Sequence, residues 1–400
     1  MSFLSRRLDG VKPSATLAIN SRALELKAQG YDVINLGVGE PDFDTPQNIK
    51  HAAIKAIEAG ATKYTTINGT KELRKAISMK FHRDNGLDYT VDEVIAGTGA
   101  KQLLFNGLMA TVDHGDEVII PAPYWGSYEE MVIFAGGKPV IVEGHPDNNF
   151  KITAAQLEAA ITPRTKWFML NSPSNPSGAV YSAAELKSLS EVLLRHPHVY
   201  IMSDDIYEHI IFDGIKFTNI VQVEPALFSR TLVINGVSKS YSMTGWRLGY
   251  AAGPLALIKA MITVQSHSTS CASSISQAAA TEALNGPQTF LESQSKSFAK
   301  RRDLIVRLLN EIPGIHCAKP QGAFYVLPDF RGIVGMHAKD HTIKSCEDVA
   351  AYLLEEAQIA VVPGAAFGIP GFLRISYPVS EQVIESACNR IARSLSKLKK

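Results

Sequence analysis

Short apolar runs alternate with segments of helical spacing between about residues 90 and 250. The apolar runs are typical of buried strands and comprise Glu117–Pro121, Pro139–Val142, Lys166–Leu170, Val199–Ser203 and Thr231–Ile234. Segments with helical spacing of apolar residues lie between these runs. In Ala183–Leu194, this spacing predicts a helix with one apolar stripe formed by Leu186, Leu189, Leu193 and Leu194. Strands that alternate with helices predict βαβ units, and therefore a mainly parallel sheet with helices on both faces.

The pattern changes after residue 285. A long, charged segment, Leu291–Asn310, precedes two short apolar runs at Phe324–Leu327 and Phe372–Tyr377, and an amphipathic helix follows near the C-terminus. This order predicts a second, smaller α+β domain. From the residues alone, the first 45 residues can pack with either unit.

Composition narrows the class of protein. The chain has 400 residues, of which 46% are hydrophobic and 20% charged, with a formal net charge of +1. Such a balance gives no basic excess for nucleic-acid binding and argues against disorder. No apolar stretch approaches the roughly 20 residues of a membrane span, and no secretory signal is visible at the N-terminus. Four scattered cysteines form no CxxC pair, which favours a reduced, cytoplasmic enzyme.

The first candidate site is the glycine turn Gly97–Lys101, between the apolar run EVIAG and a helical segment. Glycine after a strand lets the backbone approach a phosphate, and the following helix offers unpaired N–H groups at its positive end. A dinucleotide fingerprint would need a third glycine where Gln102 stands. The turn is therefore either a phosphate site or a structural strand–turn–helix.

Two further candidates follow strands. The segment Asn171–Gly178 (NSPSNPSG) is a rigid Pro-Gly loop, in which Asn175 is either a ligand or a turn residue. In the segment SDDIY, Asp204 ends an apolar strand, where a carboxylate is costly without a cationic partner, and Tyr207 can face the same crevice. Asp204 could equally cap a helix.

The fourth candidate is the turn that contains Lys239, which follows the run TLVI. Lysine forms Schiff bases with aldehydes, whereas arginine binds a phosphate with a bidentate fork. Ser238 and Arg247 accompany Lys239 within this segment. Together they suggest a phosphorylated aldehyde cofactor, although a lysine in a turn is usually a solvated surface residue.

The fifth candidate is Arg374 in the run FLRISY, which is either an exposed edge residue or a buried cation that requires a carboxylate. The chain has no GxxxxGK[ST], HExxH, GxSxG or DFG motif, so the sequence does not support a kinase, a zincin or a serine hydrolase. The pair His196 and His198 flanks a proline and is expected at the surface.

Taken together and in this order, these motifs resemble the fold-type I pyridoxal 5′-phosphate (PLP) aminotransferases of class I. The resemblance runs from Lys12–Thr16 (KPSAT) to Leu373–Tyr377 (LRISY), and it includes LGVGEPDFDTP, KYTTINGTKELRKAI, PAPYWGSYEEM, NSPSNPSGAVY and VSKSYSMTGWRLGY. The most similar subgroup is that of bacterial aspartate aminotransferases, some of which also act on prephenate.

The resemblance implies a PLP-dependent transferase fold of type I, which is an α/β fold. A large PLP-binding domain, residues 46–285, would contain a mainly parallel seven-stranded sheet. A smaller α+β domain would combine residues 1–45 with residues 286–400. The resemblance also implies a homodimer.

The resemblance further implies the catalytic roles. Lys239 would form the Schiff base with the cofactor aldehyde and later carry the proton between Cα and C4′. Asp204 would pair with the protonated pyridine nitrogen. Tyr207 and Asn175 would hydrogen-bond the ring 3′-oxygen, and Trp125 would stack on the ring.

By the same resemblance, Arg247, Ser238 and the backbone of Gly99, Ala100 and Lys101 would hold the cofactor phosphate. Tyr64 would reach it from the other subunit of the dimer.

The implied substrate site has two ends. Arg374 would bind the α-carboxylate, near Gly39, Trp125 and Asn175. We find no match to the partner-subunit arginine with which the other main subgroup holds the distal carboxylate. In this subgroup, that role is expected of Lys101, Thr16 and Lys12.

The predicted activity is therefore transamination between L-aspartate and 2-oxoglutarate, giving oxaloacetate and L-glutamate by a ping-pong route through pyridoxamine phosphate. One alternative is a glutamate/aspartate–prephenate aminotransferase. Others are an aromatic aminotransferase or a PLP decarboxylase, lyase or racemase on the same scaffold. A PLP-binding regulatory domain is disfavoured, because almost the whole chain matches the enzyme. The expected partners are amino acids and 2-oxo acids, without nucleic acid or membrane.

Overall fold

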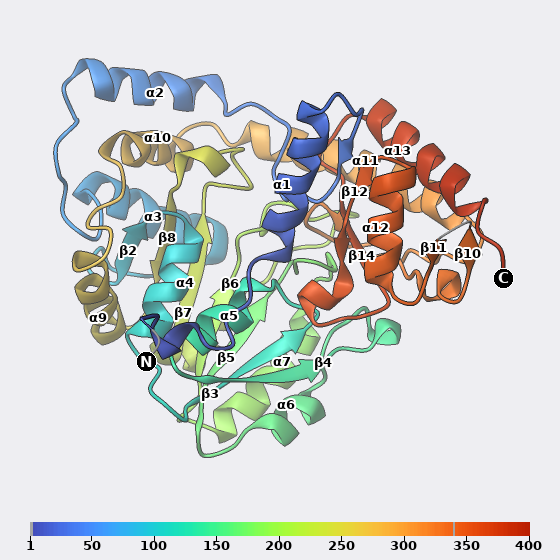
Figure 1. The fold of residues 1–400 in the computed structure, drawn as a ribbon. Coiled ribbons are helices and arrows are strands. Elements are labelled where there is room, and N and C mark those ends of the chain that lie inside the picture. The colour runs from blue at the N-terminus through green and yellow to red at the C-terminus, as the bar shows by residue number, and fades with distance from the viewer. Residues whose placement is uncertain (1–2, 339–340) are drawn as a thin grey trace.

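The computed structural model describes residues 3–338 and 341–400 (Figure 1). Its α-helices are α1 (Ala15–Ala28), α2 (Gln47–Glu58), α3 (Lys71–Asn85), α4 (Ala100–Met109), α5 (Ser127–Phe134), α6 (Ala154–Ala160), α7 (Ala183–Arg195), α8 (Ile220–Val223), α9 (Leu255–Ser266), α10 (Ser274–Asn285), α11 (Thr289–Asn310), α12 (Cys346–Glu356) and α13 (Glu381–Leu395). Short 3₁₀ helices are η1 (Arg6–Leu8), η2 (Pro146–Asn148), η3 (Pro225–Arg230), η4 (Thr244–Trp246), η5 (Arg331–Ile333) and η6 (Gly364–Phe367).

The strands are β1 (Ile34–Asn35), β2 (Val94–Gly97), β3 (Glu117–Ala122), β4 (Lys138–Glu143), β5 (Thr165–Asn171), β6 (Tyr200–Asp204), β7 (Thr231–Gly236), β8 (Gly249–Ala252), β9 (Tyr325–Val326), β10 (His337–Ala338), β11 (His341–Thr342), β12 (Ile359–Ala360), β13 (Val362–Pro363) and β14 (Leu373–Ser376).

The main sheet has seven strands in the order β2-β8-β7-β6-β5-β3-β4 (Figure 1). Only β8 runs against its neighbours, β2 and β7. The predicted α/β fold with a mainly parallel seven-stranded sheet is confirmed. In this arrangement the carboxyl ends of β5, β6 and β7 meet at one edge, where α/β folds place their ligands.

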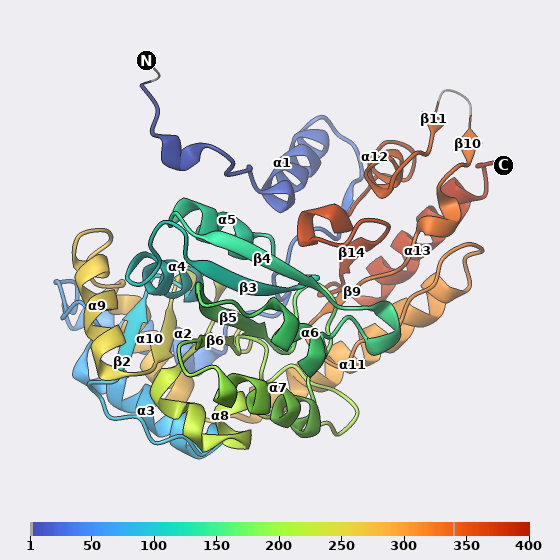
Figure 2. The same cartoon turned by 90° about the horizontal axis from the view of Figure 1, so that it is seen from below.

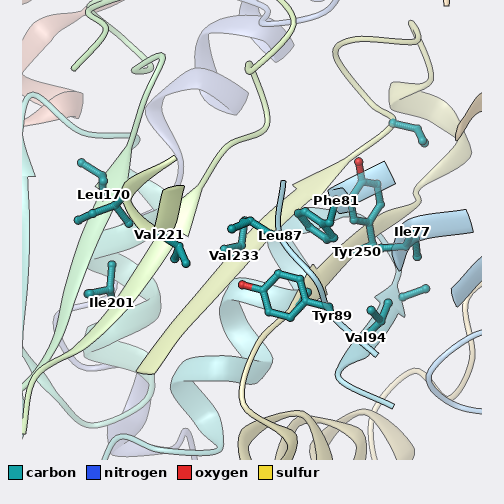
Figure 3. Close-up of a cluster of buried hydrophobic side chains, with 14 of the residues drawn as sticks. Ile77, Phe81, Leu87, Tyr89, Val94, Leu170, Ile201, Val221, Val233 and Tyr250 are labelled. Atoms are coloured by element: carbon teal, nitrogen blue, oxygen red, sulfur yellow. The ribbon is translucent and has the colours of Figure 1, made fainter. Parts of the chain in front are cut away.

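Helices cover both faces of the sheet, as the alternating pattern requires. Leu232 and Ile234 of β7 pack with residues of α4, α5 and α9, whereas Val233 packs on the other face with α3, α7 and α10. Figure 2 shows α4 and α5 on one side of the sheet and α3, α7 and α8 on the other. On the α3 side, Phe81 lies with ring centroids 5.8 Å from Tyr250 (Figure 3).

The predicted leucine stripe of α7 is correct for three of its four members. Leu186, Leu189 and Leu193 are buried, but Leu194 is 40% exposed. Successive helical residues are about 100° apart, so Leu194 lies beyond the arc that faces the sheet. Its neighbour Val192, which the stripe omits, is buried instead.

A second core lies between α11, α12 and α13 and the short strands β9, β12 and β14. The N-terminal segment lies beside it, because β1 pairs in parallel with β12 and the backbone N–H of Ser376 donates to the Leu36 carbonyl at 2.8 Å. The domain boundaries at residues 46 and 285 stay a prediction. Among the described residues, none of the helices has the length and apolar character that crossing a bilayer requires.

Candidate active site

The loops after β5 and β6 are tied together at the carboxyl edge of the sheet. Asn171 and Asp204 are register partners at the ends of these strands. The Asn171 amide donates to the Asp204 backbone carbonyl at 2.8 Å, and its side-chain oxygen accepts from the backbone N–H of Asn175, also at 2.8 Å. Asn171 therefore fixes the start of the Pro-Gly loop relative to the strand that carries Asp204.

A cavity of about 220 Å³ lies at this edge and collects most of the residues that the sequence singled out. It is lined by Thr16, Gly39, Ala100, Lys101, Trp125, Asn175, Asp204, Tyr207, Ser238, Lys239, Arg247 and Arg374. Gly99 packs against the guanidinium of Arg247, which is one of these lining residues. Within residues 3–338 and 341–400, Lys12 and Tyr64 lie outside this cavity.

Lys239 follows β7, and its side chain turns into the cavity rather than into solvent. Its Nζ donates to the Gly39 carbonyl at 2.6 Å. Burial lowers the pKa of Lys239 from 10.5 to about 8; the Glu40 carboxylate opposes this effect, and the Arg374 guanidinium reinforces it. An appreciable fraction of this amine is therefore neutral near pH 8, as a nucleophile or a base requires.

Asp204 is a buried carboxyl at the end of β6. It accepts hydrogen bonds from the Tyr128 hydroxyl at 2.6 Å and from the backbone N–H of Ile206 at 3.3 Å. Burial raises the pKa of Asp204 from 3.8 to about 6 in spite of these donors. A cationic group in the cavity would recover the electrostatic cost of this carboxylate.

The glycine turn after β2 forms a cradle for an anion. Gly99 has φ +83°, and a Cβ there would lie 2.5 Å from a nitrogen of Arg247. At Gly249, a Cβ would collide with the backbone nitrogen of Ala100, the first residue of α4. This helix begins without a side-chain cap. Its N–H groups and the Arg247 guanidinium therefore converge where a phosphate would be stabilised.

Arg374 is a fully buried cation on β14, with 2% of its surface exposed. Its guanidinium lies between two aromatic rings, 4.8 Å from the centroid of Tyr325 and 4.7 Å from that of Phe367. It donates to the Asn175 side-chain oxygen at 3.1 Å and to the Gly37 carbonyl, but its Nε has no partner among the described residues. This buried charge fits an incoming carboxylate.

Lys101 and Trp125 line the same cavity and contact each other. The Lys101 Nζ lies 4.6 Å from the centroid of the Trp125 ring. Burial, with repulsion from Arg247, lowers the pKa of Lys101 from its ordinary value. Thr16, near the start of α1, lies in the same cavity.

The two remaining predicted residues lie elsewhere. The backbone N–H of Lys12 donates to Glu130 at 2.7 Å, and Lys12 is an exposed residue. Tyr64 is 92% exposed. Their predicted roles stay predictions.

Pyridoxal phosphate fits this set of residues. The cavity offers an amine of lowered pKa, an anion cradle, a buried carboxyl and an aromatic face. These match, in turn, an aldehyde, a phosphate, a pyridinium nitrogen and a planar ring.

Six lining residues of the cavity were not predicted as site residues: Leu104, Tyr128, Asn171, Ile206, Thr244 and Tyr325. Tyr128 lies three residues after Trp125, in the first turn of α5, and its backbone N–H donates to the Trp125 carbonyl at 2.8 Å. That spacing could have identified it. Tyr325 stands in an apolar run, where no local signal separates it from core.

Comparison with known proteins agrees with this geometry. Residues 31–391 match the sequence model of the family described as "Aminotransferase class I and II". An aspartate/prephenate aminotransferase of Cereibacter sphaeroides is 58% identical over 392 residues, which cover 98% of each chain. An aspartate aminotransferase of Rhizobium meliloti is 55% identical over 393 residues, covering 98% of this chain and 96% of the relative.

Solved structures give the same result. The crystal structure of an aspartate aminotransferase from Rhizobium meliloti superposes with a TM-score of 0.96 at 54% identity, covering 100% of both chains. An aspartate aminotransferase from Thermus thermophilus, solved with maleate, superposes with a TM-score of 0.93 at 44% identity, covering 98% of this chain and 100% of the other.

Proposed function

The chain belongs to the class I and II aminotransferases, and from this premise we propose that it transfers the amino group of L-aspartate to 2-oxoglutarate. The products are oxaloacetate and L-glutamate. The observation that carries the proposal is one cavity holding the Lys239 amine, the buried Asp204 carboxyl and the buried Arg374 guanidinium. The relatives named aspartate aminotransferase and aspartate/prephenate aminotransferase support the same reaction.

The proposed cofactor is PLP. When bound, it supplies an aldehyde that condenses with amines and a ring that accepts the electron pair left when the Cα proton departs. The turn at Gly99 with Ala100 and Lys101, together with Ser238 and Arg247, would hold its phosphate. Trp125 would cover one face of its ring.

The residues of the cavity would carry the other steps of binding and proton transfer. Lys239 would take the substrate Cα proton and deliver it to C4′ of the cofactor, and its lowered pKa leaves an appreciable fraction of the amine neutral near pH 8. Asp204 stabilises a proton on the ring nitrogen. Tyr207 and Asn175 bind the ring 3′-oxygen. Since burial raises the pKa of Tyr207 well above its ordinary value, its phenol stays protonated and acts as a donor.

Arg374 would bind the α-carboxylate, beside Gly39, Trp125 and Asn175. Its guanidinium is held by two rings and lacks a partner at Nε. Lys101 and Thr16, which line the same cavity, would bind the distal carboxylate, and Lys12 would join them if its segment moves toward the cavity. The relative solved with maleate, a dicarboxylate, supports a substrate with two acidic ends.

We also propose a homodimer, in which Tyr64 of one subunit reaches the phosphate cradle of the other. The side chain of Tyr64 is 92% exposed, so it is accessible to a second copy. The proposed large domain is 46–285, and the small domain joins 1–45 with 286–400.

A second candidate acceptor is prephenate, which the name of the Cereibacter relative favours. A lysine at the distal-carboxylate end is compatible with prephenate, because an ammonium on a flexible side chain tolerates carboxylates at different distances from Cα.

The test is a half-reaction. Protein loaded with PLP is mixed with L-aspartate alone, and we expect one oxaloacetate per active site together with conversion of the cofactor to its amino form. Adding 2-oxoglutarate should restore the original spectrum, and prephenate is then tried as acceptor. Release of carbon dioxide or ammonia instead would identify a decarboxylase or a lyase and overturn the proposal.

A further inference from the structure

Tyr325 contacts both ends of the candidate active site. It lies on β9 and is 1% exposed. Its ring supports the Arg374 guanidinium, 4.8 Å from the ring centroid. Its hydroxyl lies 2.7 Å from the hydroxyl of Tyr207, which stands in the segment after β6. Tyr325 thus connects the proposed carboxylate anchor to the proposed cofactor-side phenol.

The position of the Tyr325 hydroxyl is fixed by a close approach to Gly39. A Cβ at residue 39 would collide with that hydroxyl, so the backbone of Gly39 packs directly against it. The carbonyl of the same glycine accepts from the Lys239 Nζ. The hydroxyl therefore lies between Tyr207 and the residue that holds the Lys239 amine.

The direction of the hydrogen bond between the two phenols matters, because each has only one hydrogen to donate. The 2.7 Å separation of the two oxygens allows either hydroxyl to donate. In the proposed function, Tyr207 gives its single hydrogen to the cofactor 3′-oxygen, so toward Tyr325 it can only accept. Tyr325 is therefore the donor of the pair.

We propose that Tyr325 is a positioning residue of this enzyme, which donates to Tyr207 and thereby directs the Tyr207 hydrogen into the cavity, while its ring seats Arg374. The inference rests on the proposed function. Accepting one hydrogen bond makes a phenol a better donor of its own. Tyr325 would therefore strengthen the hydrogen bond that Tyr207 gives to the cofactor 3′-oxygen.

Two variants separate the hydroxyl from the ring. Tyr325→Phe keeps the ring under Arg374 and removes only the hydroxyl. Phe367→Leu removes the other ring from the same guanidinium and carries no hydroxyl, which makes it the matched control. Phe367 is 1% exposed, so both variants change a buried position.

The first readout is the pH titration of the visible absorbance of the PLP-loaded protein, and the second is KM for L-aspartate. Tyr325→Phe should raise the titration midpoint by about half a pH unit, because the group that stabilises the unprotonated form is weakened. Its KM should change less than about twofold. Phe367→Leu should raise KM by about fivefold, as expected for loss of a cation–π contact, and leave the midpoint in place.

Three results would overturn the inference: an unchanged midpoint in Tyr325→Phe, a lowered midpoint, or equal midpoint shifts in both variants. A lowered midpoint would mean that Tyr207 donates to Tyr325. Wild-type protein that binds no PLP, or binds it without transamination, would contradict the proposed function instead, so the two failures are distinguishable.

Discussion

The hydroxyl of Tyr128 donates to Oδ2 of Asp204 at 2.6 Å, although the two residues are 76 positions apart. Tyr128 stands on α5, one turn beyond Trp125, and the two rings meet edge to face with centroids 5.5 Å apart. The start of α5 and the residue just before its cap therefore provide both the ring for the cofactor face and a donor for the carboxyl that would hold its nitrogen.

This relationship gives the first prediction. Tyr128→Phe removes a donor that lowers the pKa of Asp204, so that pKa should rise above about 6. A carboxyl that is more often neutral pairs less well with a pyridinium, and PLP affinity should fall about tenfold. Equilibrium dialysis against PLP measures this affinity. Tyr124→Phe is the control, because its hydroxyl binds Glu129 instead. Equal losses in both variants would contradict the assignment.

The pH dependence of cofactor loading tests the lowered pKa of Lys239. Below a pH of about 8 the amine is mostly protonated, and above it mostly neutral. Since only the neutral amine attacks an aldehyde, the rate at which cofactor-free protein takes up PLP should rise with pH and level off above about 8. Stopped-flow absorbance measures this rate. A rate that still rises at pH 10, like that of an ordinary lysine, would contradict the assignment.

Three variants test which residues bind the distal carboxylate of the substrate. Lys101→Ala should reduce kcat/KM for L-aspartate by about 2–4 kcal/mol of transition-state stabilisation, with little effect on L-alanine. Lys12→Ala should cost less, because Lys12 is exposed outside the cavity. Arg374→Lys should reduce activity on both amino acids, since every substrate has an α-carboxylate. Equal losses for both amino acids in Lys101→Ala would assign that lysine to the cofactor or the fold.

A buried ion pair behind the active site should govern acid stability. Lys80 pairs with Glu208, and Glu208 also accepts from Asn85 at 2.9 Å and Asn235 at 2.8 Å. Glu208→Gln removes the nearer carboxylate of the buried Lys80 and leaves it with Asp84, at 4.0 Å, so it should cost about 3 kcal/mol of unfolding free energy at pH 7. Urea titration measures it. Glu311→Gln, which removes an exposed pair with Arg307, should change little.

The same pair has a signed pH dependence. Lys80 and the neighbouring groups hold the pKa of Glu208 well below its ordinary value of 4.5, despite burial. A depressed pKa stabilises the folded state above the unfolded pKa, and the contribution is lost as the pH falls below it. The stability gap between wild type and Glu208→Gln should therefore narrow between pH 5 and pH 3. A gap that is constant over this range would exclude titration of Glu208.

The sequence predicted the sheet because its strands are nearly continuous apolar runs, and β3, β5 and β7 lie where the runs are. It also singled out Asp204 and Arg374 as charged residues in or at the end of apolar runs, and Lys239 as a lysine in the turn after one, but only the family resemblance gave these residues their roles. Tyr325 could not be found in this way. Its role depends on Tyr207 and Arg374, which lie 118 and 49 positions away along the chain, and only the fold brings the three together.

Lys12 and Tyr64 show the opposite limit. The resemblance assigns them to the active site, but in this single chain both are exposed. To serve the active site, Tyr64 would need a second subunit, and Lys12 would need a movement of its segment. Neither requirement is encoded in the spacing of nearby residues.

The central claim is that Lys239 carries the cofactor, and borohydride reduction of the PLP-loaded protein followed by peptide mapping tests it most directly. Lys101 is the natural competitor, because it lines the same cavity and its pKa is also lowered. We expect one phosphopyridoxyl group per chain on Lys239, and none in Lys239→Ala. An adduct on Lys101 or another lysine, or no adduct at all, would contradict it.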